Sequence, residues 1–137
     1  MANKMRLRVA TPENAKFDND VEMVIMRCIS GDMGILPHHE AASAILDDGV
    51  LRIMNDGGER RMAVFGGIAQ IRNNTVTLIA NDAKWPEEID VASVGSDLER
   101  LTDQMKEEPD SAEQKRCLVL MRRCSLQLEV GNYSTVN

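Results

Sequence analysis

The hydrophobic period of this chain changes near Trp85 and Pro86, and that change limits the folds it can adopt. Before it, apolar and polar residues alternate, as in Met5, Leu7 and Val9, which is typical of half-buried strands. After it, apolar residues recur at steps of three and four, which is typical of amphipathic helices. The pattern predicts an α+β fold, with an N-terminal antiparallel β-sandwich over residues 1–85 and a C-terminal antiparallel two-helix hairpin over residues 86–137.

Turn signals divide the first part into short strands. Asp47-Asp48-Gly49, Asn55-Asp56-Gly57-Gly58 and Asn73-Asn74 interrupt alternating segments, and many short strands with regular turns are typical of a sandwich or barrel. The alternation places Val21, Met23 and Ile25 on one face. The glycine pair Gly66-Gly67 follows a strand and precedes no helix, so we expect a bend or bulge there and not a phosphate site.

Start and stop signals delimit the two helices. Asp90 is a candidate N-cap for the first helix, and Pro109 follows its expected end. A capping box that begins at Ser111 predicts the start of the second helix, and Gly131 is expected as its C′ residue. Cys117 and Cys124 would lie about 10.5 Å apart along that helix, too far for a disulfide, so we expect reduced thiols.

Charge excludes one class of partner and suggests another. The net charge of −6 argues against nucleic acid, which requires clustered lysine and arginine. The first helix is acidic and the second is basic, with Arg116, Arg122 and Arg123. Two interpretations stay open: the two helices attract one another, or the basic helix leaves the acidic one for an acidic partner.

Motifs of catalysis do not emerge from the sequence. It contains no G-x-S-x-G, P-loop, G-x-G-x-x-G or H-E-x-x-H pattern. A metal site at His38 and His39 with Asp32 or Glu40 is disfavoured, because adjacent side chains in an extended segment point in opposite directions. No apolar run is long enough to span a bilayer, and a cytoplasmic location is the expectation.

Several segments together resemble the epsilon subunit of the F-type ATP synthase. The similarity covers nearly the whole length and rests on the glycine pair and on six further segments. These segments are Thr11-Pro12-Glu13 with Phe17, Val21-Glu22-Met23-Val24, Gly31-Asp32-Met33-Gly34-Ile35-Leu36-Pro37 with His39, Gly49-Val50-Leu51-Arg52-Ile53, Val76-Thr77-Leu78-Ile79-Ala80-Asn81 and Glu87-Glu88-Ile89-Asp90.

The resemblance implies a non-catalytic rotor subunit that couples ATP synthesis and hydrolysis to ion transport across the membrane. Its expected partners are the gamma subunit, the membrane rotor ring of c subunits and, when the hairpin extends, the alpha/beta catalytic head. The implied location is peripheral, at the cytoplasmic face of the bacterial inner membrane. The hairpin is expected to restrain ATP hydrolysis.

The resemblance also implies roles for individual residues. A ring-contact loop would comprise Gly31, Asp32, Met33 and Gly34, with Asp32 as its acidic tip. His38, His39, Glu40 and Ala42 would contact gamma and the stalk at the same end of the sandwich. The inhibitory contact would come from the basic side of the second helix, at Arg116, Arg122 and Arg123.

Two departures from the family pattern change these expectations. The family usually has Pro-Gly-His where this chain has Pro37-His38-His39, and an apolar patch that follows is small and polar here. Members that bind ATP carry Ile-Asp-x-x-Arg-Ala, but after Ile89 and Asp90 this chain has Ser93 in place of the arginine. Because a charge-assisted bond to phosphate is lost, we expect no cofactor, and weak or absent ATP binding to the hairpin.

Two other classes of function remain as alternatives. The same sandwich and hairpin would also suit a free-standing module that binds a small ligand, and tight nucleotide binding by a chain that ignores gamma would favour it. A metal-dependent enzyme centred on His38 and His39 is the weaker alternative, because the sequence offers no evident third ligand.

Overall fold

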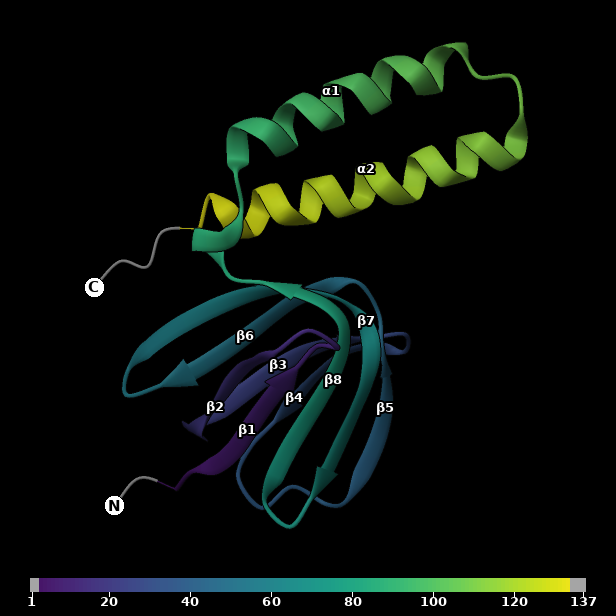
Figure 1. The fold of residues 1–137 in the computed structure, drawn as a ribbon. Coiled ribbons are helices and arrows are strands. Elements are labelled where there is room, and N and C mark those ends of the chain that lie inside the picture. The colour runs from purple at the N-terminus through teal and green to yellow at the C-terminus, as the bar shows by residue number, and fades with distance from the viewer. Residues whose placement is uncertain (1–2, 134–137) are drawn as a thin grey trace.

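The computed structural model describes residues 3–133 and shows eight strands followed by two long helices (Figure 1). Strands end at Lys84 and a single helical turn begins at Pro86. The strands are β1 (Met5–Ala10), β2 (Ala15–Val21), β3 (Met23–Cys28), β4 (Gly31–Ile35), β5 (Ala42–Leu46), β6 (Gly49–Asn55), β7 (Gly58–Arg72) and β8 (Thr75–Lys84); the helices are η1 (Pro86–Glu88), α1 (Val91–Glu107) and α2 (Ser111–Gly131).

The strands form the predicted β-sandwich, and hydrogen bonding continues around its corners. Along the sheet the order is β2-β1-β8-β7-β5-β3-β4, and β6 joins β3 to β7. All of these neighbours are antiparallel except β1 and β8, which run parallel with Leu7 opposite Val76. The predicted fold class is therefore confirmed, with one parallel pair added to it.

β7 bends at Gly66 and Gly67 and therefore forms part of both layers of the sandwich. Its first half pairs with β6 and its second half with β5. Both glycines have a positive φ, and a Cβ on Gly67 would lie 2.2 Å from the carbonyl oxygen of Ile79. A residue with a side chain fits neither the space nor the conformation. The bend predicted at this glycine pair is confirmed.

The main core lies between the two layers. Leu7, Leu51 and Leu78 are among its fully buried side chains, as their alternation predicts. The prediction for residues 21–25 was wrong, because Val24 is buried whereas Met23 and Ile25 are half-exposed. The chain bends at Glu22, whose amide donates to the carbonyl of Met54, and the alternation resumes in the opposite phase.

Both helices begin at aspartate caps. The Asp90 carboxylate accepts a hydrogen bond from the Ser93 amide, as expected, and starts α1. The second helix begins one residue earlier than predicted. Its N-cap is Asp110, whose carboxylate accepts from the amide of Ala112, so Ser111 is already helical. The aspartate carboxylate satisfies an amide at the helix start that would otherwise lack a partner.

The hairpin has a small core of its own. Leu101 of α1 packs with Cys117 and Cys124 of α2, and partly buried residues of both helices surround them. Both cysteines are free thiols, as predicted. Neither described helix is long and apolar enough to cross a membrane.

α2 lies between α1 and the sandwich (Figure 1), and its last turn packs against the segment that enters the hairpin. Val130 is buried with Ala63, Phe65 and Ile89. The prediction for Gly131 was wrong: it is the last helical residue, and Asn132 is the C-cap in right-handed conformation. A Cβ on Gly131 would lie 2.8 Å from a methyl of Val91, so this glycine allows close packing rather than a left-handed turn.

Candidate functional site

The segment expected as the ring-contact loop is mostly a strand. The β3–β4 turn is formed by Ile29 and Ser30, and β4 begins at Gly31 with φ +118°. Asp32 lies directly opposite Arg27, and its carboxylate accepts from the guanidinium at 3.3 Å. The exposed side chains at the tip are therefore Ile29 and Ser30, and Asp32 is an ion-paired strand residue instead of an acidic tip.

The next two residues of this segment, Met33 and Gly34, pack within the β3–β4 hairpin. Met33 lies opposite Met26 and packs against the main core while remaining half-exposed. A Cβ on Gly34 would lie 3.4 Å from the terminal methyl of Met23. The exposed atoms available to a partner are therefore mainly those of Ile29 and of the Arg27–Asp32 pair.

A row of exposed isoleucines crosses the outer face of the sandwich beside this turn. Ile45 of β5, Ile68 of β7 and Ile79 of β8 are directly opposite one another, and the Ile29 amide donates to the carbonyl of Ile45. These four isoleucines, which we call the isoleucine row, are 65%, 56%, 54% and 52% exposed in the order 29, 45, 68 and 79. Large exposed apolar patches of this kind mark interaction surfaces.

Sequence reasoning missed the isoleucine row, although a signal for it existed. In the alternating sequence Ile79 falls in phase with Thr75 and Thr77, on the polar face of its strand, and Ile68 follows the glycine pair. An isoleucine at an outward position is common by itself. The row becomes visible when the register places three such positions side by side.

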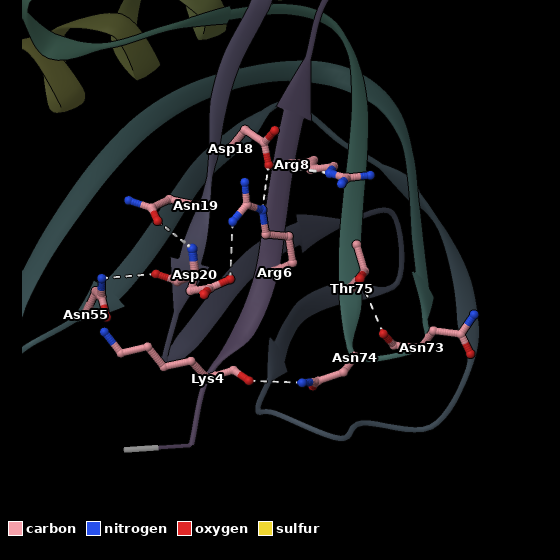
Figure 2. A network of polar contacts seen from close by, with 10 residues as sticks. All are labelled: Lys4, Arg6, Arg8, Asp18, Asn19, Asp20, Asn55, Asn73, Asn74 and Thr75. Atoms are coloured by element: carbon pink, nitrogen blue, oxygen red, sulfur yellow. Dashed lines mark hydrogen bonds and ion pairs between the residues drawn. The ribbon is translucent and has the colours of Figure 1, made fainter. Parts of the chain in front are cut away.

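The stalk-contact residues lie at the other end of β4 and β5. His38 has φ +66°, and its amide donates to the side-chain oxygen of Asn74 at 2.8 Å. Asn74 in turn donates to the carbonyl of Lys4 (Figure 2), so the β7–β8 turn fastens this segment to the N-terminal strand. The expectation that both contact segments share one end of the sandwich was wrong, because the full length of β4 separates them.

The remaining stalk-contact residues are held by local bonds and by the core. Nδ1 of His39 lies 2.8 Å from the carbonyl oxygen of Glu40, and both side chains are exposed. Ala42 lies opposite Ile71 and packs partly buried against the main core. The structure describes no group of three histidine, cysteine or acidic side chains within residues 3–133 that could hold a metal ion.

The basic residues of α2 point to different neighbours. Arg123 donates from Nε to the Asp48 carboxylate of the sandwich at 3.0 Å, and its guanidinium lies 5.9 Å from the Phe65 ring. Arg116 pairs with Glu113 of its own helix at 2.9 Å. Arg122 lines a cavity of about 290 Å³ between α2 and the sandwich.

The helices do not attract one another through ion pairs in the described part of the chain. Arg100 and Lys106 of α1 pair within their own helix, and no ion pair joins α1 to α2 among residues 3–133. Mutual attraction through close charge pairs therefore does not account for the difference in charge. α2 also exposes three consecutive apolar side chains, Leu118, Val119 and Leu120.

The residues of the vestigial nucleotide motif have structural roles. Ile89 is buried in the contact between the hairpin and the sandwich, and the Asp90 carboxylate is occupied by the amide of Ser93 at 3.1 Å. Burial raises the pKa of the Cys28 and Cys124 thiols, so neither is activated as a nucleophile. In this structure the motif residues therefore serve packing and helix capping.

Comparisons with known proteins identify relatives of this chain. Residues 4–86 match the family described as ATP synthase, Delta/Epsilon chain, beta-sandwich domain. The ATP synthase epsilon chain of Synechococcus sp. (strain WH7803) is 34% identical over 93% of this chain and 96% of its own length. The chain of that name from Bacillus velezensis is 32% identical, with the same two coverages.

Solved structures share the fold across both parts of the chain. A chain of the Euglena gracilis mitochondrial ATP synthase superposes with a TM-score of 0.70 at 22% identity, and the match covers 93% of this chain and 77% of that one. A chain of the Tetrahymena thermophila mitochondrial ATP synthase, in a structure of its central stalk and c-ring, gives 0.60 at 16%, over 95% and 98%. The family match and the curated relatives, with the shared fold, show that this chain belongs to the family of ATP synthase epsilon chains.

Proposed function

We propose that this chain is a non-catalytic central-stalk subunit of a rotary ATP synthase, which couples ATP synthesis and hydrolysis to transmembrane ion transport. The isoleucine row is the observation that carries the proposal, and the names of the relatives support it. The chain would act peripherally at the cytoplasmic face of the bacterial inner membrane, bound through the complex. It would need no cofactor, with ATP binding to the hairpin weak or absent.

The gamma subunit is the proposed partner of the isoleucine row. Full burial of an isoleucine side chain contributes roughly 1.5–3 kcal/mol, so covering the exposed half of four would contribute about 3–6 kcal/mol before the costs of association. The row crosses three adjacent strands, and a flat face of this kind suits a rigid helical shaft. His38, His39, Glu40 and Ala42 would extend the contact with gamma and the stalk from the far end of β5.

The β3–β4 hairpin is the proposed contact with the membrane rotor ring. It carries Gly31, Asp32, Met33 and Gly34, and its turn carries Ile29, the end member of the isoleucine row. The ion pair of Asp32 with Arg27 presents both charges at the surface. Polar loops of a ring would meet this pair, which favours specificity and rate of association more than affinity.

The hairpin is proposed to restrain ATP hydrolysis by contacting the alpha/beta catalytic head when it extends. The exposed residues of α2 include the apolar Leu118, Val119 and Leu120 and the cation of Arg122. Arg123 is bound to Asp48 in the present position and Arg116 to Glu113. Extension would therefore exchange the bond of Arg123 to the sandwich for one to the head.

A binding experiment tests the sandwich function. Ile68→Asp places a charge in the middle of the isoleucine row, and we expect it to weaken binding to isolated gamma by a factor of about 100. Leu118→Asp changes an equally exposed side chain on the hairpin and should leave gamma binding unchanged. Equal affinity of the two variants for gamma in calorimetry would contradict the proposal.

An activity experiment tests the hairpin function separately. The soluble head is reconstituted with the full chain or with the triple change of Arg116, Arg122 and Arg123 to alanine. A rise of the ATP hydrolysis rate of several-fold is expected from the triple variant, because all three cations are offered to the head. An unchanged rate, with gamma binding intact, would show that the hairpin does not act as a brake through these residues.

A further inference from the structure

A groove opens between the edge of the sandwich and the β6–β7 hairpin, away from every surface discussed so far. Its volume is about 480 Å³, which lies within the usual range of ligand sites. Phe17 and Asn19 of β2 form one wall, and residues 58–60 of β7 form the other. Ile53, which is buried in the main core, contributes to the lining. The groove is thus the open mouth of the sandwich.

Strand edges without a neighbour border the groove. β2 pairs with β1 alone and is the end strand of the sheet. β7 pairs with β6 over residues 58–62, and its pairing with β8 begins only at Ala63. Edges of this kind offer backbone amides and carbonyls to an added extended segment.

Arg60 is a cation on the inner face of its strand. It lies directly opposite the buried Ile53, so its side chain extends over the mouth of the sandwich. Its guanidinium lies 3.9 Å from the centre of the Trp85 ring and 6.0 Å from that of Phe17. Among residues 3–133 it has no carboxylate partner, whereas its neighbour Arg61 is paired with Glu59 at 2.6 Å. An arginine on an aromatic floor is preorganised to bind a carboxylate.

Asn55 calls for a hydrogen-bond donor, whereas Arg60 calls for an acceptor. Its amide nitrogen donates to the Asp20 carbonyl at 3.1 Å (Figure 2), which fixes the orientation of the side chain. Its oxygen is buried in the groove wall and has no partner in the described part of the chain. A buried acceptor without a donor is costly, so a small turn of the side chain that brings this oxygen to an N–H group of an occupant is favoured.

We propose that this groove binds an extended segment of a partner protein that carries a carboxylate side chain. The carboxylate would bind the Arg60 guanidinium, a backbone N–H of the segment would donate to Asn55, and an apolar side chain would pack on Phe17. Free phosphate or a nucleotide phosphate group brings mainly acceptor oxygens and is a poorer match to the oxygen of Asn55. A peptide offers both the donor and the acceptor.

Phage display of random dodecapeptides on the folded full chain provides the test. Enriched peptides are expected to carry an aspartate or glutamate, and synthetic copies should bind about tenfold more weakly to Arg60→Gln, because a charge-assisted bond is lost. Arg61→Gln is the matched control, since it removes the adjacent cation from the opposite face and should leave the affinity unchanged. Thermal unfolding confirms that both variants remain folded.

The position of the bound peptide is read by NMR on the labelled full chain. The side-chain amide signals of Asn19 and Asn55 should shift on titration with an enriched peptide, and replacing its acid by the amide should abolish the shift. Failure to enrich any peptide, enrichment of peptides that bind Arg60→Gln equally, or shifts confined to the isoleucine row would each overturn the proposal. In that event Arg60 serves to block the open edge against aggregation.

Discussion

Replacing His38 by glycine should stabilise the sandwich. His38 has φ +66°, a left-handed conformation that costs an L-residue about 1–2 kcal/mol. Glycine removes that cost but loses about 0.5–1 kcal/mol more chain entropy on folding. The net expectation is a gain of about 0.5–1 kcal/mol in the free energy of unfolding. The exposed imidazole contributes little packing, and the bond from this amide to Asn74 is retained.

Urea unfolding followed by tryptophan fluorescence measures this gain in the sandwich itself. Trp85 is the single tryptophan of the chain and belongs to the main core, so its signal is separated from any independent unfolding of the hairpin. His39→Gly is the matched control. His39 is not among the residues with positive φ. Glycine there adds the entropy cost without removing backbone strain, and should lower the free energy of unfolding by about 0.5–1 kcal/mol.

Unfolding of His38→Gly at the same urea concentration as the wild-type chain, or at a lower one, would refute backbone strain at this position. A gain in both variants would show that loss of the imidazole, and not the backbone conformation, is responsible. A gain in His38→Gly alone would explain why the family usually has glycine at this place: the turn requires a left-handed residue, and histidine occupies it under strain.

Three further changes have defined outcomes. Gly67→Ala should prevent stable folding, because its Cβ would clash with the backbone at Ile79; circular dichroism and the loss of cooperative unfolding report it. Lys16 and the Trp85 amide hold the pKa of Glu88 below its ordinary value of 4.5. The stability contributed by this pair is therefore present above pH 4.5 and lost as the pH falls through the lower folded pKa, and Glu88→Gln should reduce that dependence in urea titrations. Calorimetry with Mg-free ATP should show no binding in the micromolar range, and Ser93→Arg should strengthen it; micromolar affinity of the unchanged chain would refute the loss of phosphate contact.

Local sequence pattern was sufficient for the fold class. The period of two placed Leu7 and Leu78 in the core, and the change of period near Trp85 separated strands from helices. The pattern predicted the wrong buried face where a tertiary contact changes the phase of the alternation. The bend at Glu22 depends on a hydrogen bond to Met54, and a contact so distant in sequence leaves no trace in the alternation around residue 22.

The helix ends illustrate the same limit. Gly131 has the sequence position of a C′ residue, yet the helix includes it because its missing side chain makes room for Val91. Propensity identifies a glycine near a helix end, but it does not distinguish a conformational need from a packing need. Only the neighbour across the interface decides between them.

The interaction surfaces were predictable only in part. Motif resemblance identified the β3–β4 segment and the histidine pair, both of which are continuous in sequence. The isoleucine row and the groove at Arg60 are assembled from strands that are distant in sequence. Their members become neighbours through register, which single-sequence periodicity does not specify.

The packing of the hairpin is consistent with the proposed change of position. Its own core, built around Leu101, Cys117 and Cys124, is separate from the cluster that joins it to the sandwich, so the helices can leave with that core intact. Departure would expose Phe65, Ile89 and Val130, at a cost of roughly 1.5–3 kcal/mol for each large side chain. The three half-exposed apolar residues of α2, once covered by a partner, would offset about 1 kcal/mol each. The partner contact thus recovers part of this cost, and charged contacts such as that of Arg123 with Asp48 then help to decide which position is occupied.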